Sequence, residues 1–257
     1  MNLNLLVSLL PVEKKVVVDV GASVGASPAF SLMQTDACGK GLCVEGAAAN
    51  AQKLREKVKD KPHIRVHEGL ITPENVADIF AAADIKHVDV YKQDIDGYDL
   101  TLLRALFNSG IFPKILYVEY NEKIPIGVEF EVKYKPGHFW DGSHFFGFSL
   151  LAGYKVLREN GYVIVALPDG NNILAVHNSF MNIYQIPIEQ LYRQYYLNAP
   201  QFWWYPWNAD IRHWNNLSAE QAVADIIDYF TGPRKMRNQT DLGQPIDRDT
   251  FVCQVGI

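Results

Sequence analysis

The chain of 257 residues is 48% hydrophobic and 21% charged, a composition typical of a globular protein with one large domain or two small ones. Its net charge of −5 argues against a nucleic-acid partner, because proteins that bind phosphate backbones carry clusters of Lys and Arg. The three cysteines, Cys38, Cys43 and Cys253, lack the spacing of metal ligands, so we expect free thiols in a reducing, cytoplasmic setting.

The chain opens with a short apolar run over residues 1–11, and no basic segment precedes it. The run is too short to span a bilayer and lacks the charges of a signal peptide. We expect it to form the first helix and to cover one edge of a sheet.

Apolar runs then alternate with helical patterns as far as about residue 120, which predicts a parallel sheet with helices on both faces. The expected strands are residues 16–20, 41–45, 64–67, 88–93 and 115–120. The expected helices begin at Pro28 and cover residues 48–59, 73–83, where Glu74 suits the N-terminus, and 100–107. A helix near 148–160 and strands at 162–167 and 173–177 follow, and their tight turn predicts a closing antiparallel hairpin. The predicted fold is a Rossmann-like α/β fold with a mostly parallel seven-stranded sheet.

Residues 121–147 interrupt this pattern without a clear period, and we interpret them as an insertion that serves as a lid or binding loop. We divide the chain at residue 180. Residues 1–180 form the cofactor-binding domain, and residues 181–257 form an aromatic-rich extension packed on it, without a recognisable sheet pattern.

The segment Gly21-Ala22-Ser23-Val24-Gly25 follows a buried strand and precedes a helix. Glycines there let the backbone approach a ligand closely, and a helix N-terminus offers free N–H groups. Glu45 ends the second strand, where a carboxylate can hold both ribose hydroxyls of an adenosine. This arrangement serves dinucleotides and S-adenosylmethionine about equally.

Two features favour S-adenosylmethionine. The dinucleotide fingerprint Gly-x-Gly-x-x-Gly is not met, since Ser23 and Ala26 stand where its second and third glycines belong. Asp19 can receive the ammonium of a methionine moiety, directly or through water, and would repel a pyrophosphate. The structural alternative is that Asp19 caps the turn and Glu45 is a solvated strand-end residue. We expect further cofactor contacts from Gly46, Glu68, Gly69, Leu70 and Asp94.

The fourth strand ends in two carboxylates, Asp94 and Asp96. Residues i and i+2 of a strand face the same side, and open α/β sheets bind ligands at the carboxyl ends of their strands. Glu119 and Asn121 follow the fifth strand and should lie beside them. One acid could serve as a general base, the group could bind Mg²⁺ or Ca²⁺, or the acids could only order the loop and the cofactor's methionine end.

The irregular segment also carries His138, Trp140, Asp141 and His144. A histidine there is an alternative base, and we place His144 among the catalytic candidates. The other interpretation is a surface loop packed by its own aromatic side chains.

The stretch Gln201-Phe202-Trp203-Trp204-Tyr205-Pro206-Trp207 is unusually aromatic, and His213 and Trp214 follow it. Such rings can stack on a sugar, anchor an interface between copies of the chain in a homo-oligomer, or pack a lid onto the sheet. We expect these aromatics and the insertion to form the acceptor pocket together.

Residues 88–99 resemble the FkbM family of S-adenosylmethionine-dependent methyltransferases, in which an apolar strand precedes Lys-x-Asp-x-Glu-Gly-x-Glu. Lys92, Asp94 and Gly97 match this pattern, and Asp96 and Asp99 each stand one methylene short of its glutamates. The loop at residues 18–22 with Glu45, the Val118-Glu119-Tyr120-Asn121 segment and the helix at 147–161 are also similar to the family. The resemblance covers about residues 15–180.

The resemblance implies a class I methyltransferase fold, S-adenosylmethionine as the cofactor, and O-methylation of a hydroxyl on a sugar, glycan or secondary-metabolite acceptor. One alternative is a Rossmann oxidoreductase that uses NAD, against which the unmet glycine fingerprint argues. The other is an inactive methyltransferase-fold protein that binds a partner. We expect a small-molecule or glycan partner, no nucleic acid and no membrane span.

Overall fold

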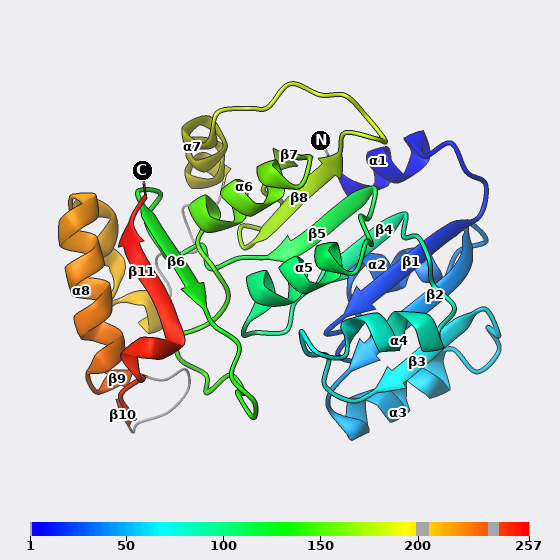
Figure 1. Cartoon of the computed structure of the whole chain (residues 1–257), viewed down its shortest axis with the longest axis horizontal. Coiled ribbons are helices and arrows are strands. Elements are labelled where there is room, and N and C mark those ends of the chain that lie inside the picture. Colours follow the sequence, from blue (N-terminus) through cyan, green and yellow to red (C-terminus); the bar gives the residue numbers. More distant parts are fainter. Residues whose placement is uncertain (1, 199–205, 236–241, 257) are drawn as a thin grey trace.

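The computed structural model describes residues 2–198, 206–235 and 242–256. Its centre is one large sheet of β1 (Lys15–Val20), β2 (Cys38–Glu45), β3 (Ile64–Glu68), β4 (Val90–Gln93), β5 (Ile115–Glu119), β7 (Tyr162–Ala166) and β8 (Asn172–His177). The seven strands lie in the order β3-β2-β1-β4-β5-β8-β7, and β8 runs antiparallel to both of its neighbours (Figure 1). This is the Rossmann-like, mostly parallel α/β fold that the sequence predicts, with its closing antiparallel hairpin.

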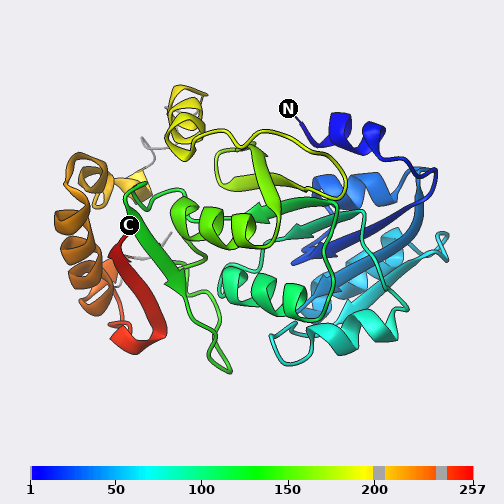
Figure 2. The same ribbon diagram turned by 45° about the horizontal axis from the view of Figure 1, so that its top comes forward.

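Helices cover both faces of the large sheet (Figure 2). One face carries α1 (Leu3–Leu9), α2 (Pro28–Met33) and α3 (Ala48–Lys57), and the other carries α4 (Val76–Ala82), α5 (Asp99–Asn108), α6 (Leu150–Glu159) and part of α7 (Ile188–Asn198). Alternate residues of a strand face opposite sides, so Val17 packs with α1–α3 while Val18 and Val20 pack with α4–α6. Strands buried on both faces explain the near-continuous apolar runs in the sequence.

The first helix covers a face of the sheet, and the expectation that it covers an edge was wrong. Leu3, Leu6, Val7 and Leu10 form an apolar stripe at helical spacing, and all four are buried in the core that contains Ile115 of the central strand β5. Burying these four apolar side chains requires a broad apolar surface. A sheet face provides such a surface, and a sheet edge does not.

Most predicted boundaries hold within a few residues, but α4 begins later than expected. Asn75 accepts a hydrogen bond from the Thr72 N–H at 2.7 Å and closes a turn before the helix. Glu74 therefore lies outside the helix and does not serve its N-terminus. The start of α2 is as predicted, with Pro28 in the first turn and Ser27 accepting from the Phe30 N–H at 2.9 Å.

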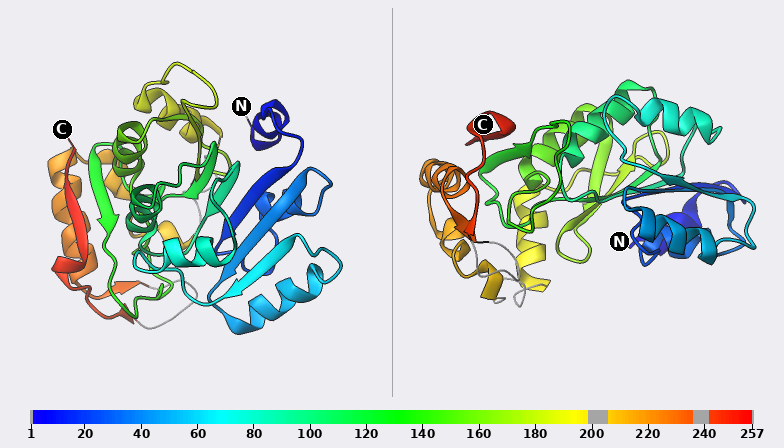
Figure 3. Two further views of the ribbon diagram at one scale, coloured as in Figure 1. Left: turned by 45° about the vertical axis from the view of Figure 1, so that its right-hand side comes forward. Right: turned by 90° about the horizontal axis from the view of Figure 1, so that it is seen from below.

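A second, smaller unit lies beyond the carboxyl-terminal edge of the large sheet, on the left of Figure 1 and again in both views of Figure 3. Strand β6 (Val128–Val132) pairs antiparallel with β11 (Phe251–Val255), and α8 (Ala219–Thr231) packs on this pair. We call β6, β11 and α8 the small lobe. Short elements join it: β9 (Arg234–Lys235), β10 (Leu242–Gly243), η2 (Pro206–Asn208), η3 (Arg212–Asn216) and η4 (Arg248–Thr250).

The small lobe corrects two sequence expectations. Residues 121–147 contain a strand, and the C-terminal part of the chain contributes β11, although neither was predicted. The alternation in β6 is plain in retrospect: Val128, Phe130 and Val132 are buried in a core shared with Phe251, and the residues between them are glutamates.

Among the residues that the structure describes, no helix combines the length and the apolar character that crossing a bilayer requires.

Candidate active site

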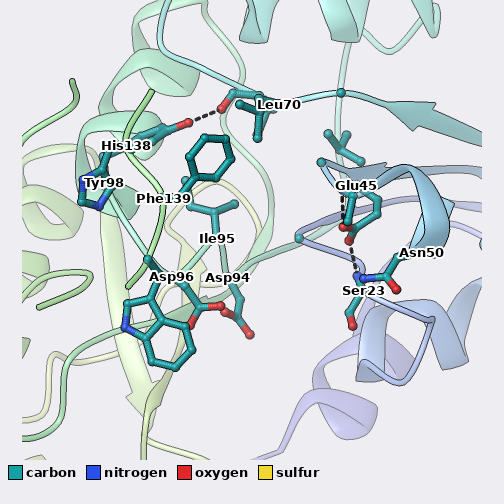
Figure 4. Close-up of a pocket in the computed structure, with 17 residues that line it drawn as sticks. Ser23, Glu45, Asn50, Leu70, Asp94, Ile95, Asp96, Tyr98, His138 and Phe139 are labelled. Atoms are coloured by element: carbon teal, nitrogen blue, oxygen red, sulfur yellow. Dashed lines mark hydrogen bonds between the residues drawn. The ribbon is translucent and has the colours of Figure 1, made fainter. Parts of the chain in front are cut away.

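A pocket of about 370 Å³ opens at the carboxyl-terminal edge of the large sheet (Figure 4). Its walls come from the loops that follow β1, β2, β3 and β4 and from one segment of the predicted insertion. The predicted site residues that line it are Gly21, Ser23, Glu45, Gly46, Gly69, Leu70, Asp94 and Asp96, joined by Tyr98, His138, Phe139 and Trp140. Residues far apart in the sequence thus meet where the fold is expected to bind ligands.

The loop after β1 contacts the loop after β4 at Gly21, a position where no side chain fits. Gly21 has a φ of +70°, and a Cβ atom there would lie 1.7 Å from the carbonyl oxygen of Asp94. Ser23 follows with a φ of +50°, a left-handed conformation that costs free energy for a residue with a side chain. The loop is therefore held in a strained shape beside the pocket.

Glu45 holds this loop in place and faces the pocket. Its carboxylate accepts hydrogen bonds from the Ser23 N–H at 2.6 Å and from the Ala47 N–H at 2.8 Å, and the residue is 8% exposed. Each carboxylate oxygen has a second lone pair, so Glu45 can still accept hydroxyl hydrogens from a ligand. Figure 4 shows Glu45 and Ser23 on the opposite side of the pocket from Asp94 and Asp96.

Four residues predicted to touch the cofactor are not among those that line the pocket: Asp19, Ala22, Gly25 and Glu68. Glu68 is paired with Arg55 at 2.7 Å on the outer side of the edge strand β3. Ala22 is 2% exposed and packs in the core beneath the loop, and a Cβ atom on Gly25 would meet the ring of Phe30 at 2.8 Å. Ala22 and Gly25 shape the loop, and the side chain of Glu68 turns to Arg55 of α3, so the geometry does not support its expected contact with the cofactor.

Asp19 lies beneath the pocket. It is fully buried and accepts a hydrogen bond from the Ser27 hydroxyl at 2.5 Å, while the Lys92 ammonium lies 3.6 Å away. Burial raises the pKa of Asp19, and Lys92 and Ser27 oppose that shift. Because Asp19 does not line the pocket, any contact with a ligand ammonium would have to be indirect.

Lys92 is a buried cation beside Asp94. It is 5% exposed, donates to the Gly21 carbonyl at 3.0 Å and lies 3.5 Å from a carboxylate oxygen of Asp94. Burial alone would lower the pKa of Lys92, but Asp19, Asp94 and Glu119 raise it overall, so the ammonium stays charged. The sequence offered Lys92 only as a match to a family pattern.

The carboxylates at the ends of β4 and β5 meet as predicted. One oxygen each from Asp94, Asp96 and Glu119 lie within 4.8 Å of one another, because β4 and β5 are neighbours in the sheet. Burial raises the pKa of Glu119 well above its usual value, and the nearby charges of Asp94 and Asp96 raise it further. Asp96 has a φ of +52° and is, after Ser23, the second non-glycine residue at the pocket in the left-handed conformation.

A fourth acid, Asp99, orders the loop that carries this cluster. Its carboxylate accepts from the N–H groups of Ile95 at 3.1 Å and Gly97 at 3.0 Å and from the Gln93 amide. Burial raises the pKa of Asp99 to about 6. The Tyr98 hydroxyl donates to the Ile71 carbonyl at 2.8 Å and ties the same loop to the one after β3.

Two of the predicted catalytic residues play other parts. The buried Asn121 donates from its amide to the carbonyls of His144 at 2.8 Å and Phe146 at 3.0 Å, so it ties the insertion together. His144 is fully buried on the side of the small lobe, with its ring stacked on Trp207 at a centroid distance of 4.2 Å. Neither residue lines the pocket, so the geometry does not support the catalytic roles predicted for them.

The histidine at the pocket is His138, which the sequence offered only as an alternative. Its ring lies edge-on to Tyr98 at 6.4 Å and to Phe145 at 6.2 Å. Burial lowers its pKa, Asp141 partly opposes the shift, and its Nε2 is buried without a hydrogen-bond partner among the described residues. Phe139 beside it is 65% exposed at the pocket mouth.

The described part of the aromatic stretch belongs to the small lobe. Trp203 and Trp204 lie outside the described residues. Trp214 is fully buried in the core of the small lobe and donates to Asp225 at 2.7 Å, so it cannot form a pocket wall. Trp207 lies against His144 and under the Lys123 ammonium, which is 4.9 Å from its ring centroid.

No protein-family model and no curated protein matches the sequence. Among solved structures, the N-terminal domain of EvdMO1, determined with S-adenosylhomocysteine and D-fucose, is 13% identical over 68% of this chain and 79% of that chain (TM-score 0.46). A protein in the NADB-Rossmann superfamily from Streptococcus agalactiae is 15% identical over 86% and 90% (0.45). The methyltransferase FkbM from Methylobacillus flagellatus is 18% identical over 64% of this chain and 44% of that chain (0.41). These are likenesses of fold, and membership in the FkbM family remains a hypothesis.

Proposed function

We propose that the chain is an S-adenosylmethionine-dependent methyltransferase that methylates a hydroxyl group of a small-molecule or glycan acceptor. One observation carries the proposal. A buried carboxylate, Glu45, faces a pocket beside the left-handed loop after β1, at the strand ends where α/β folds hold the ribose of a nucleoside cofactor.

The charges of the pocket support a sulfonium cofactor over a dinucleotide. Asp94 and Asp96 lie at the end of the pocket away from Glu45 (Figure 4), and one carboxylate oxygen of Glu119 lies within 4.8 Å of theirs. Their negative field attracts a sulfonium and an ammonium and opposes a pyrophosphate. With the ribose on Glu45, the adenine would lie toward Leu70 and the methionine end toward Asp94.

The chain's own contribution to the reaction would be orientation and proton acceptance. The bound cofactor supplies an electrophilic methyl group. Glu119 is poorly placed to take the acceptor's proton, because it is 7% exposed and does not line the pocket. We assign proton acceptance to His138, whose lowered pKa keeps the ring neutral near pH 7 and whose Nε2 is unpaired among the described residues.

Calorimetric titration with S-adenosylhomocysteine, S-adenosylmethionine and NAD tests the cofactor assignment. Glu45→Gln should weaken S-adenosylhomocysteine binding by about 1–3 kcal/mol, since a charged hydrogen-bond acceptor is lost. Glu68→Gln makes the same change outside the pocket and should leave the affinity unchanged. NAD binding more tightly than S-adenosylhomocysteine would favour the oxidoreductase alternative.

Methyl transfer itself separates an enzyme from an inactive binding protein. Incubation with S-adenosylmethionine labelled in the methyl group, together with a panel of sugars and glycans, should move label to a hydroxyl of at least one acceptor. Cofactor binding with no transfer to any member of the panel would favour the binding-protein alternative.

A further inference from the structure

The spacing of the strand-end carboxylates matches that of ligands around a small cation. One oxygen from each of Asp94, Asp96 and Glu119 lies within 4.8 Å of the other two. Oxygen ligands bind Mg²⁺ and Ca²⁺ at about 2.0 to 2.6 Å, so ligands on opposite sides of an ion are about 4 to 5 Å apart. The three carboxylates can therefore reach one ion without a change in the backbone.

Glu119 supplies a second, independent observation. It is 7% exposed, and its Oε1 accepts from the Asn171 amide at 2.9 Å. Its other oxygen, Oε2, is buried and accepts no hydrogen bond from the described residues. A buried carboxylate oxygen normally has a partner, and this one belongs to a side chain turned toward Asp94 and Asp96.

The local balance of charge is negative. The ion pairs of the cluster among the described residues involve Lys92, which lies 3.5 Å from Asp94. The same ammonium lies 3.6 Å from Asp19 and donates to the Gly21 carbonyl, so it is shared between both acids. A second positive charge would relieve the repulsion among the carboxylates.

We infer that Asp94, Asp96 and Glu119 form a binding site for one divalent cation, Mg²⁺ or Ca²⁺, at the acceptor end of the pocket. Asn121 is not among the ligands, because its amide nitrogen donates to two carbonyls of the insertion and its Oδ1 accepts from the Lys123 N–H at 3.3 Å. Three carboxylates leave coordination positions open, and Asp94 and Asp96 line the pocket, so those positions face the acceptor. Two neighbouring hydroxyls, as in a sugar or another polyol, would fill them.

This role in methylation rests on the proposed function, whereas the cation site itself does not. A hydroxyl bound to a cation loses its proton more readily. The hydroxyl proton would pass to Nε2 of His138, the new bond would join the oxygen to the methyl carbon, and the carbon–sulfur bond would break with its electron pair on sulfur. Atoms and charge balance, with a neutral thioether and a protonated imidazole as the other products.

The test titrates Mn²⁺, and then Mg²⁺ and Ca²⁺, into the full chain by calorimetry, with Mn²⁺ binding followed also by electron paramagnetic resonance. We expect one ion per chain. Asp96→Asn should weaken binding about tenfold or more, since one of a few charged ligands is lost. Asparagine tolerates the left-handed backbone of residue 96, so this variant should keep its fold.

A matched pair of glutamate variants makes the assignment specific. Glu119→Gln should weaken Mn²⁺ binding by a similar factor, whereas Glu122→Gln alters a glutamate that is 1% exposed and paired with Lys123 outside the cluster, and should not. No binding at millimolar Mn²⁺, or equal binding in wild type, Asp96→Asn and Glu119→Gln, would overturn the inference. Mn²⁺ binding without S-adenosylhomocysteine binding would support the cation site and refute the proposed function. S-adenosylhomocysteine binding without Mn²⁺ binding would support the proposed function and refute the cation site.

Discussion

A side chain at Gly21 would collide with the loop that carries the acids, since its Cβ atom would lie 1.7 Å from the Asp94 carbonyl oxygen. Gly110 also has a positive φ, +81°, but nothing lies within 4 Å of such an atom. Gly110→Ala therefore carries the backbone strain alone, about 1–2 kcal/mol. Gly21→Ala should lower the free energy of unfolding by about 1–3 kcal/mol more, measured by urea denaturation, because the strained loop must also shift. Equal losses in the two variants would show that the two loops are not in contact.

The protonation of His138 is a second property of a single residue that can be measured. Burial lowers its pKa below 6.5, and the negative charge of Asp141 partly opposes the shift. Asp141→Asn keeps the oxygen that accepts from the Ser143 N–H but removes the charge, so the pKa of His138 should fall further. Magnetic resonance of the ring across the acidic and neutral pH range gives both midpoints. A midpoint at or above 6.5 in the wild type would argue against a neutral base at this position.

Among the elements, the pairing of β6 with β11 depends on a shared aromatic core. Phe251 is 1% exposed and lies 5.9 Å from Phe130 and 5.5 Å from Phe145, centroid to centroid. Phe251→Ala should cost about 3–5 kcal/mol of unfolding free energy, the range for removing a buried ring. Phe139→Ala removes the same ring from an exposed position and should change stability by about 0.5 kcal/mol or less. Similar losses in the two variants would mean that β11 adds little to the fold.

The elements of the large sheet were predictable because their signals are local. Strands β1 and β4 are buried almost throughout, and the glycines that follow them, Gly21 and Gly97, mark their ends. The pairing of β6 with β11 was not predictable from the sequence. Phe130 and its partner Cys253 are far apart in the chain, and neither segment carries a pattern that identifies the other as its partner. Alternation predicts that a strand exists and not which strand it pairs with.

The residues of the candidate site also differ in whether local sequence signals could predict their positions. The meeting of Asp94 and Glu119 follows from adjacent strand ends, so the sequence predicted it. The choice between His138 and His144 depends on the path of an irregular loop, which has no period to read, and the sequence favoured the buried one. The loss of Glu68 from the pocket depends on one ion pair with α3, which composition does not indicate.

In the whole molecule, the carboxyl-terminal edge of the large sheet faces the small lobe (Figure 1). The pocket lies at that edge. The insertion contributes both to the pocket, through His138 and Phe139, and to the small lobe, through β6. One continuous segment of chain therefore joins the small lobe to the pocket wall. We expect a shift of β6 in the small lobe to move His138 and Phe139 in the pocket wall.

The measurement that tests the central claim most directly is a crystal structure of the chain with S-adenosylhomocysteine. The account predicts both ribose hydroxyls on the carboxylate of Glu45, the adenine toward Leu70 and the sulfur beside Asp94. S-adenosylhomocysteine bound away from Glu45, or a nucleotide with its pyrophosphate over the loop at Gly21, would contradict it.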